Sequence, residues 1–157
     1  MLASERALRN QPEDDKAVAT ILLVDDDFVS ILTMRRVLKK LNISNRILVA
    51  RDGQEALETL RSEIPRNPAI RAPFIVMLDM NMPRMSGGEF LQAAAADPAL
   101  KDIVIFAFET TRVAGRKREA AQPNVSATLS KDAPAETLSR AIISSGCEPL
   151  LRYVTPQ

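Results

Sequence analysis

The chain has 157 residues, of which 46% are hydrophobic, and its formal net charge is +1. These totals are typical of one domain with an ordinary core, and they give no strong attraction to nucleic acid or to an anionic membrane. Histidine is absent and cysteine occurs once, as Cys147. This excludes Ser-His-Asp and Cys-His catalysis, a His-ligated metal site and an internal disulfide. The longest apolar run, 103–108, is too short to span a bilayer, and no secretory signal is visible, so we expect a cytoplasmic protein.

The hydrophobic pattern switches repeatedly between strand-like runs and helix-like spacing. In chain order the first half predicts a flexible arm over 1–19, a strand over Thr20–Val24, a helix capped by Asp27, a strand over Arg46–Ala50, a turn at Asp52-Gly53, a helix over Gln54–Ser62 and a strand over 74–78. The second half predicts a helix over Glu89–Ala96, a strand over Ile103–Phe108, a helical segment over Arg112–Ala121, a strand over Val125–Leu129, a helix starting near Pro134 and a tail over 146–157. The first helix should bury a stripe of residues at spacings of three and four: Phe28, Ile31, Met34, Leu38 and Leu41.

Successive strand-and-helix units predict an α/β fold, a parallel sheet with helices on both faces. The doubly wound strand order 2-1-3-4-5 is the natural arrangement, and it makes the first and third strands neighbours. Asp25 and Asp26 follow the first strand, and Asp79 ends the third. These carboxylates should therefore meet at the carboxyl edge of the sheet, where open α/β sheets build their sites.

Carboxylates that meet at one edge repel one another, by roughly 4 kcal/mol for two charges about 4 Å apart at an effective dielectric constant of about 20. Such a cluster either raises a pKa or holds a cation, and an all-oxygen site with room for water suits Mg²⁺ better than Zn²⁺. A carboxylate that faces Mg²⁺ can attack phosphorus and become an aspartyl phosphate. Lys131 directly follows the fifth strand and is placed to neutralise phosphoryl oxygens.

Several motifs together resemble the receiver domain of bacterial response regulators over residues 20–145. They are Leu23-Val24-Asp25-Asp26-Asp27, Arg51-Asp52-Gly53-Gln54-Glu55-Ala56-Leu57, Leu78-Asp79-Met80-Asn81-Met82-Pro83 with Gly87, and Lys131. The longer segment before the third strand and the run from Asp97 to Ile103 are similar to the single-domain regulators found beside bacterial phytochromes. The resemblance implies a flavodoxin-like fold and a signalling role that is not enzymatic.

The resemblance also implies a role for each matching residue. Asp79 would be the phosphoacceptor and Lys131 would contact the phosphoryl group. Asp26 would bind Mg²⁺ directly, Asp25 would bind it through water, and Asn81 would add its main-chain carbonyl. The phosphate would come from the histidine of a partner histidine kinase, which agrees with the absence of histidine here.

Receivers usually carry Thr or Ser at the end of the fourth strand, and this chain departs from that pattern. Counting family spacings from either side selects Glu109, whereas the local sequence would select Ala107 or Phe108. None of these residues has a hydroxyl, although Thr110 and Thr111 follow at once. We expect Glu109 either to oppose the phosphoryl group electrostatically or to face solvent.

Two more positions depart from the family pattern. Thr128 stands where receivers usually have a switch aromatic, and Asp132 stands where a proline usually follows the lysine. The residues that would accept phosphate are therefore present, whereas the residues that normally couple phosphorylation to a response are replaced. We expect phosphorylation that is weakened or short-lived, without coupling between a threonine and an aromatic residue.

The leading hypothesis is a phosphoacceptor switch that signals through protein contacts, because nothing after residue 145 is long enough for a DNA-binding module. The alternative is a receiver-like scaffold or dimerisation module that is not phosphorylated. A phosphohydrolase remains a third class, since Asp25 and Asp27 have suitable spacing, but no partner motif is evident. A mononucleotide binder is disfavoured by the acidic loop after the first strand.

The C-terminal tail carries apolar residues, from which we predict a homodimer contact: Leu150, Leu151, Tyr153 and Val154.

Overall fold

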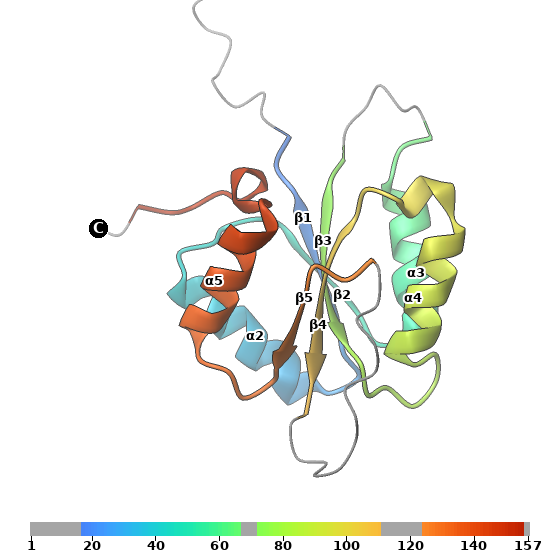
Figure 1. Cartoon of the computed structure of the whole chain (residues 1–157), viewed down its shortest axis with the longest axis horizontal. Coiled ribbons are helices and arrows are strands. Elements are labelled where there is room, and N and C mark those ends of the chain that lie inside the picture. Colours follow the sequence, from blue (N-terminus) through green and yellow to red (C-terminus); the bar gives the residue numbers. More distant parts are fainter. Residues whose placement is uncertain (1–16, 67–71, 111–123, 156–157) are drawn as a thin grey trace, which may run out of the picture.

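The computed structural model describes residues 17–66, 72–110 and 124–155. Its centre is a five-stranded, wholly parallel sheet (Figure 1), and the strand order is β2-β1-β3-β4-β5. The strands are β1 (Thr20–Val24), β2 (Ile47–Ala50), β3 (Phe74–Asp79), β4 (Val104–Glu109) and β5 (Ala127–Ser130). The predicted α/β class and strand order are confirmed.

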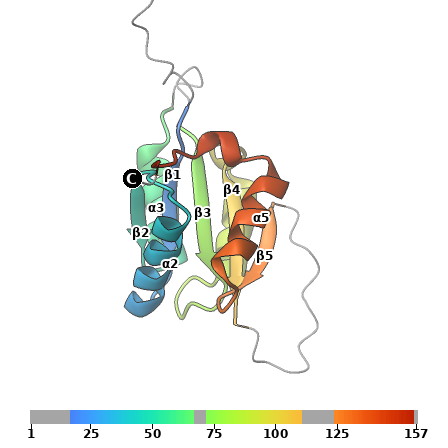
Figure 2. The same cartoon turned by 90° about the vertical axis from the view of Figure 1, so that its left-hand side faces the viewer.

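Helices cover both faces of this sheet. The α-helices are α2 (Phe28–Lys40), α3 (Gly53–Glu63), α4 (Gly87–Ala96) and α5 (Ala135–Ser145), and the short 3₁₀ helices are η1 (Pro98–Leu100) and η2 (Glu148–Leu150). Figure 2 shows α2 and α5 in front of the sheet, and Figure 1 shows α3 and α4 on the opposite side. No helix in the described part of the chain has the length and apolar character needed to cross a membrane.

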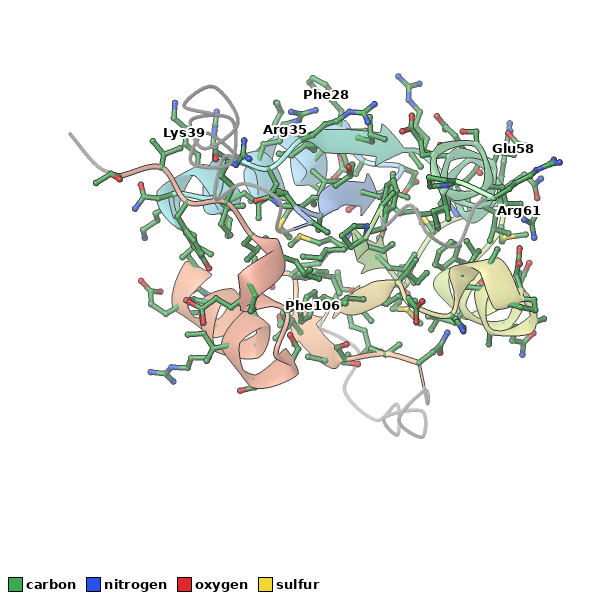
Figure 3. All side chains as sticks on the ribbon, turned by 90° about the horizontal axis from the view of Figure 1, so that it is seen from above. Phe28, Arg35, Lys39, Glu58, Arg61 and Phe106 are labelled. Carbon is green, nitrogen blue, oxygen red and sulfur yellow. The ribbon has the colours of Figure 1, made fainter. Side chains whose placement is uncertain are left out.

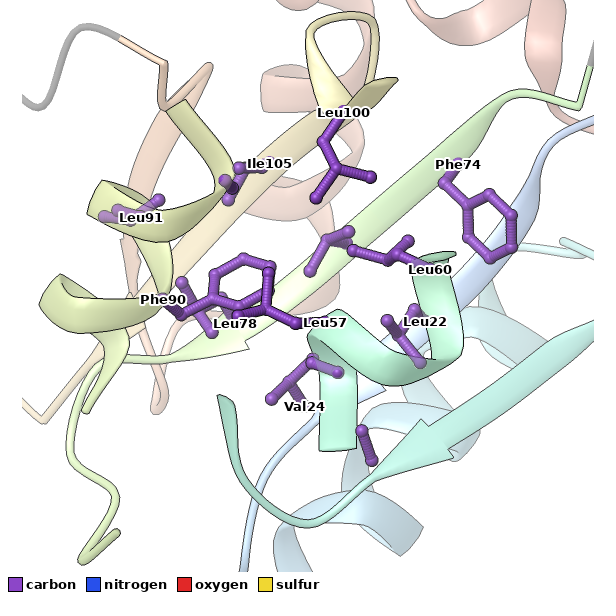
Figure 4. Close-up of a cluster of buried hydrophobic side chains, with 14 of the residues drawn as sticks. Leu22, Val24, Leu57, Leu60, Phe74, Leu78, Phe90, Leu91, Leu100 and Ile105 are labelled. Carbon is purple, nitrogen blue, oxygen red and sulfur yellow. The ribbon is translucent and has the colours of Figure 1, made fainter. Parts of the chain in front are cut away.

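The sheet separates two hydrophobic cores, and β3 contributes to both. Val76 and Leu78 belong to the first core, with α3 and α4, where Figure 4 shows Leu78. Ile75 and Met77 belong to the second core, with α2 and α5. Every residue of β3 is buried. This alternation follows from the two-residue period of a strand, and it confirms the predicted central strand buried on both faces.

The first turn of α2 corrects one sequence prediction. Asp27 caps the helix as expected, because its Oδ1 accepts a hydrogen bond from the Val29 N–H at 3.0 Å. Ile31 and Leu38 are buried, but Phe28 is 72% exposed, so its predicted place in the core is wrong. Figure 3 shows Phe28 at the periphery and Phe106 in the middle of the molecule. The helical spacing alone could not reveal that this first turn lies at the edge of the sheet, where the described elements leave it uncovered.

The C-terminal tail packs on its own domain. Leu151 is buried in the second core and Leu150 packs against it, so these two side chains cover their own domain instead of forming the predicted dimer contact. Tyr153 forms an antiparallel bridge with Ile43. Tyr153 and Val154 are 47% and 54% exposed, and the dimer contact predicted for them stays a prediction.

Some element boundaries differ from the sequence expectations by one or two residues. The last strand begins at Ala127 rather than Val125, and α3 and α4 each begin at a glycine. Ala19, expected in the arm, is buried and donates its N–H to the Leu150 carbonyl at 2.9 Å. The helical segment predicted over 112–121 and the arm over 1–16 lie outside the described residues.

Candidate functional site

Adjacent strands bring the predicted carboxylates together at the carboxyl edge of the sheet. Val24 of β1 is paired with Leu78 of β3, so Asp25 and Asp79 follow side by side. Asp25, Asp26 and Asp79 each offer a carboxylate oxygen, and these oxygens all lie within 4.8 Å of one another. The spacing results from strand register, because each carboxylate follows an apolar run that the core holds in place.

Lys131 joins this group from the far side of β4. Its Nζ lies 3.1 Å from Asp25 Oδ2 and 3.1 Å from Asp79 Oδ2. The lysine directly follows β5, and its own N–H donates to the Glu109 carbonyl at 2.9 Å. The backbone pairing of β4 and β5 therefore continues up to the residue whose ammonium group closes the cluster.

The members of the cluster differ in burial. Asp79 is 3% exposed, Asp25 is partly buried and Asp26 is exposed. Burial raises the pKa of Asp79, and the nearby Asp25 carboxylate adds to that rise, while hydrogen bonds and Lys131 oppose it. Burial alone would lower the pKa of Lys131, but the carboxylates of Asp25 and Asp79 raise it overall, so the amine stays charged.

The loop after β3 is held against the acidic cluster. The Asn81 N–H donates to Asp79 Oδ1 at 3.0 Å, which fixes one oxygen of that carboxylate. Gly87 begins α4 where a Cβ would lie 2.7 Å from the Met80 Cα and 3.1 Å from the Asp79 carbonyl oxygen. Glycine at this position therefore allows the helix to start in direct contact with the backbone around Asp79.

Thr110, which residue counting did not select, offers a hydroxyl at the same end of β4. Thr110 lines the same cavity as Asp79 and Lys131, and its Oγ1 accepts a hydrogen bond from Asn81 Nδ2 at 3.1 Å. Glu109 ends β4 one residue earlier, so its side chain belongs to the opposite face of the sheet. Counting along the sequence selects Glu109, whereas the arrangement in space selects Thr110.

The signal that could have identified Thr110 is the alternation of β4. Phe106 and Phe108 belong to the same core as α2 and α5, and two residues further along the same face is Thr110. The other two departures lie on the surface, since Thr128 and Asp132 are both exposed. Neither residue adds a buried side chain to the acidic cluster.

The chemistry of the donor set fits a hard divalent cation. The donors are carboxylate oxygens, and one of them, from Asp26, is exposed, which leaves room for water molecules. Mg²⁺ prefers oxygen ligands and keeps several waters, whereas Zn²⁺ in proteins prefers nitrogen and sulfur. The Asp25, Asp26 and Asp79 side chains therefore form an oxygen-only site of the type that Mg²⁺ favours.

A family model described as the response regulator receiver domain matches residues 21–143. The chain belongs to this family. The resemblance predicted from the motifs is thus confirmed, and the receiver domain family is a signalling family. This receiver domain is homologous to regulators of the chemotaxis type, such as the probable chemotaxis protein CheY of Rhizobium etli, which is 29% identical over 122 residues and 88% of its length.

Two further response regulators are similar to this chain. The receiver domain is 31% identical to the response regulator Rcp1 of a Synechocystis species over 91 residues, which are 58% of this chain and 61% of that protein. The solved structure of the bacteriophytochrome response regulator RtBRR is similar with a TM-score of 0.65 and 23% identity, covering 89% of this chain and 82% of that one. At that identity the likeness supports the fold alone.

Proposed function

We propose that this receiver domain accepts a phosphoryl group on Asp79 and signals through protein contacts. The single observation that carries the proposal is the convergence of the Asp25, Asp26 and Asp79 carboxylates with the Lys131 amine. This arrangement gives a buried carboxylate neighbouring acids that could share a divalent cation with it, and an ammonium group that could face phosphoryl oxygens. The family membership supports the same reading.

In the proposed reaction an Asp79 oxygen attacks phosphorus while the bond from phosphorus to the donor breaks. The donor leaves with the bonding electron pair, and an acyl phosphate forms on the protein. The Lys131 ammonium then compensates negative charge on the phosphoryl oxygens as a point charge. Asn81 keeps the Asp79 carboxylate oriented through the 3.0 Å hydrogen bond to Oδ1.

The acidic residues would hold Mg²⁺, with Asp26 and Asp79 as direct side-chain ligands, Asp25 acting through water, and the Asn81 carbonyl as the main-chain ligand inferred from the family pattern. When it is bound, Mg²⁺ supplies positive charge that offsets the repulsion between these carboxylates and an incoming phosphate. We further propose that the Thr110 hydroxyl donates to a phosphoryl oxygen. Its present hydrogen bond from Asn81 leaves its own proton free to be donated.

We propose a sensor histidine kinase as the phosphodonor. This chain has no histidine, so a phosphohistidine intermediate must belong to a partner. The name of the structural neighbour RtBRR makes a bacteriophytochrome the specific kinase to test first. The exposed Phe28 and Val29 side chains lie beside Asp26 at the start of α2, and they offer such a partner an apolar contact next to the acidic cluster.

The proposal is tested by incubating the purified chain with acetyl phosphate and measuring protein-bound phosphate. Wild type should be labelled with Mg²⁺ and should lose labelling when the metal is chelated. Asp79→Asn should not be labelled, whereas Asp102→Asn, which changes an exposed acid just before β4 and outside the cavity lining, should be labelled like wild type. Equal labelling of wild type and Asp79→Asn would exclude Asp79 as the acceptor. Unlabelled wild type that binds Mg²⁺ would favour the scaffold alternative.

A further inference from the structure

A cavity of about 250 Å³ lies between α2 and α5 and reaches the acidic cluster. Its floor is apolar and comes from three neighbouring strands, with Met77 of β3, Phe108 of β4 and Leu129 of β5. Val37 of α2 and Leu138 of α5 form facing walls. These residues are far more apolar than phosphoryl transfer requires, so the proposed function does not account for this part of the cavity.

The end of the cavity next to the acidic cluster is polar and carries an excess of negative charge. The charged residues that line it are Asp25, Asp79, Asp132 and Lys131. Lys131 is already shared between two of the carboxylates at 3.1 Å each. One further positive charge placed here would therefore reduce the repulsion among the acids, whereas a negative charge would increase it.

The size of the cavity limits what can fill it. An apolar cavity of about 150 Å³ is sufficient to bind benzene, and this cavity is larger at about 250 Å³. It therefore has room for one aromatic ring with a short aliphatic chain, which is smaller than a typical drug-sized ligand. The apolar floor would hold the ring, and the chain would bring its end group to the acids.

We propose that the cleft between α2 and α5 binds a small amphipathic cation, a molecule with an apolar body of about one ring and an ammonium group on a short chain. The ammonium pairs with the Asp25 and Asp79 carboxylates while the ring covers Met77 and Phe108. Such a ligand occupies the oxygens that Mg²⁺ would use, so the two compete. A consequence that rests on the proposed function is that the ligand inhibits phosphorylation of Asp79.

The binding claim is tested on the unphosphorylated chain by nuclear magnetic resonance titration with 2-phenylethylamine, in the absence of any phosphodonor. The neutral 2-phenylethanol and the anionic 3-phenylpropanoate serve as matched probes. The amine should shift the methyl signals of Met77, Val37 and Leu138 and should bind about tenfold more tightly than the alcohol, the equivalent of one close charge interaction. Added Mg²⁺ should weaken binding of the amine and leave binding of the alcohol unchanged.

Two variants of α2 locate the site. Val37→Phe fills the cavity and should weaken amine binding about tenfold or more. Leu32→Phe makes a similar change on the same helix outside the cavity lining and should bind like wild type. Circular dichroism checks that both variants fold, and if Val37→Phe does not fold, the three-probe comparison on wild type decides. Equal affinity for all three probes, or signal shifts away from the cavity, would overturn the proposal, whether or not Asp79 is phosphorylated.

Discussion

Asp79 is subject to two opposing requirements at the scale of a single residue. Burial and the neighbouring Asp25 raise its pKa above the ordinary value of 3.8, yet attack on phosphorus requires the ionised carboxylate. A bound divalent cation would favour that ionised form. A proton, a metal ion and a phosphoryl group would therefore compete for the same Asp79 carboxylate.

We predict that Mg²⁺ affinity decreases as the pH is lowered through the raised pKa of Asp79. The protonated carboxyl cannot bind the metal, so the affinity is fully present above that pKa and is lost below it. Calorimetric Mg²⁺ titrations at several pH values, with carbon-detected titration of the Asp79 carboxyl, measure both quantities. An Asp79 pKa at or below 3.8 in the metal-free chain would contradict the prediction.

A second prediction at this scale separates Thr110 from Glu109. Thr110→Val removes the hydroxyl and keeps the shape, and it should slow acetyl-phosphate labelling of Asp79 about tenfold, the loss of one hydrogen bond to a charged group. Glu109→Gln should label within about twofold of wild type, because its side chain belongs to the other face of β4. The reverse result, with Glu109→Gln altering the rate and Thr110→Val neutral, would restore the assignment made by counting.

At the scale of elements, one polar residue fastens the tail to the start of the sheet. Asn45 is buried, and its Nδ2 donates to the Ala19 carbonyl at 2.7 Å and the Leu150 carbonyl at 3.0 Å. Its Oδ1 accepts from the Arg152 N–H at 2.7 Å. Together with the bridge between Ile43 and Tyr153, these bonds join the loop before β2 to the chain that follows α5.

We predict that Asn45→Ala lowers the free energy of unfolding by about 2–4 kcal/mol, since buried backbone groups lose their partners. The neighbouring Ser44→Ala removes one exposed hydroxyl bond to the Arg152 carbonyl, and it should change that free energy by about 0.5 kcal/mol or less. Urea unfolding of both variants gives the comparison. If the two variants were equally stable, the tail would not depend on Asn45.

The sheet order and the carboxylate cluster could be predicted from sequence because both follow from strong local patterns. Apolar runs that end in acids define β1 and β3, and alternation with helices implies parallel strands. Contacts between residues far apart in the chain could not be predicted, because they leave no local pattern in the sequence. The bonds from Asn45 to the tail span more than 100 residues, from Asn45 to Leu150 and Arg152, and no local pattern reports them. Counting did not select Thr110, which lines the cavity, because counting assumes fixed loop lengths, whereas the face of a strand depends only on its alternation.

At the scale of the whole molecule, the exposed part of the tail carries the predicted self-association. Leu150 and Leu151 pack in or against the second hydrophobic core of their own domain. Tyr153 and Val154 are the exposed apolar residues of the described tail that a second copy could contact. We predict that Tyr153→Ser with Val154→Ser shifts a dimer to a monomer in light scattering, without loss of secondary structure. Ile143→Ser, which changes an exposed residue on α5, is the control and should leave the mass unchanged. A wild type that is already monomeric would remove the dimer from the account.

The proposed signalling by this receiver domain depends on one covalent event, the formation of an acyl phosphate on Asp79. Peptide mass spectrometry after incubation with acetyl phosphate and Mg²⁺, with borohydride reduction to mark the acylated residue, measures it directly. We predict that the reduced product, homoserine, occurs at position 79 and that Lys131→Ala lowers its yield about tenfold or more, because the phosphoryl oxygens lose their ammonium partner. Modification at Asp25 or Asp26 instead, or no modification while Mg²⁺ is bound, would contradict the account.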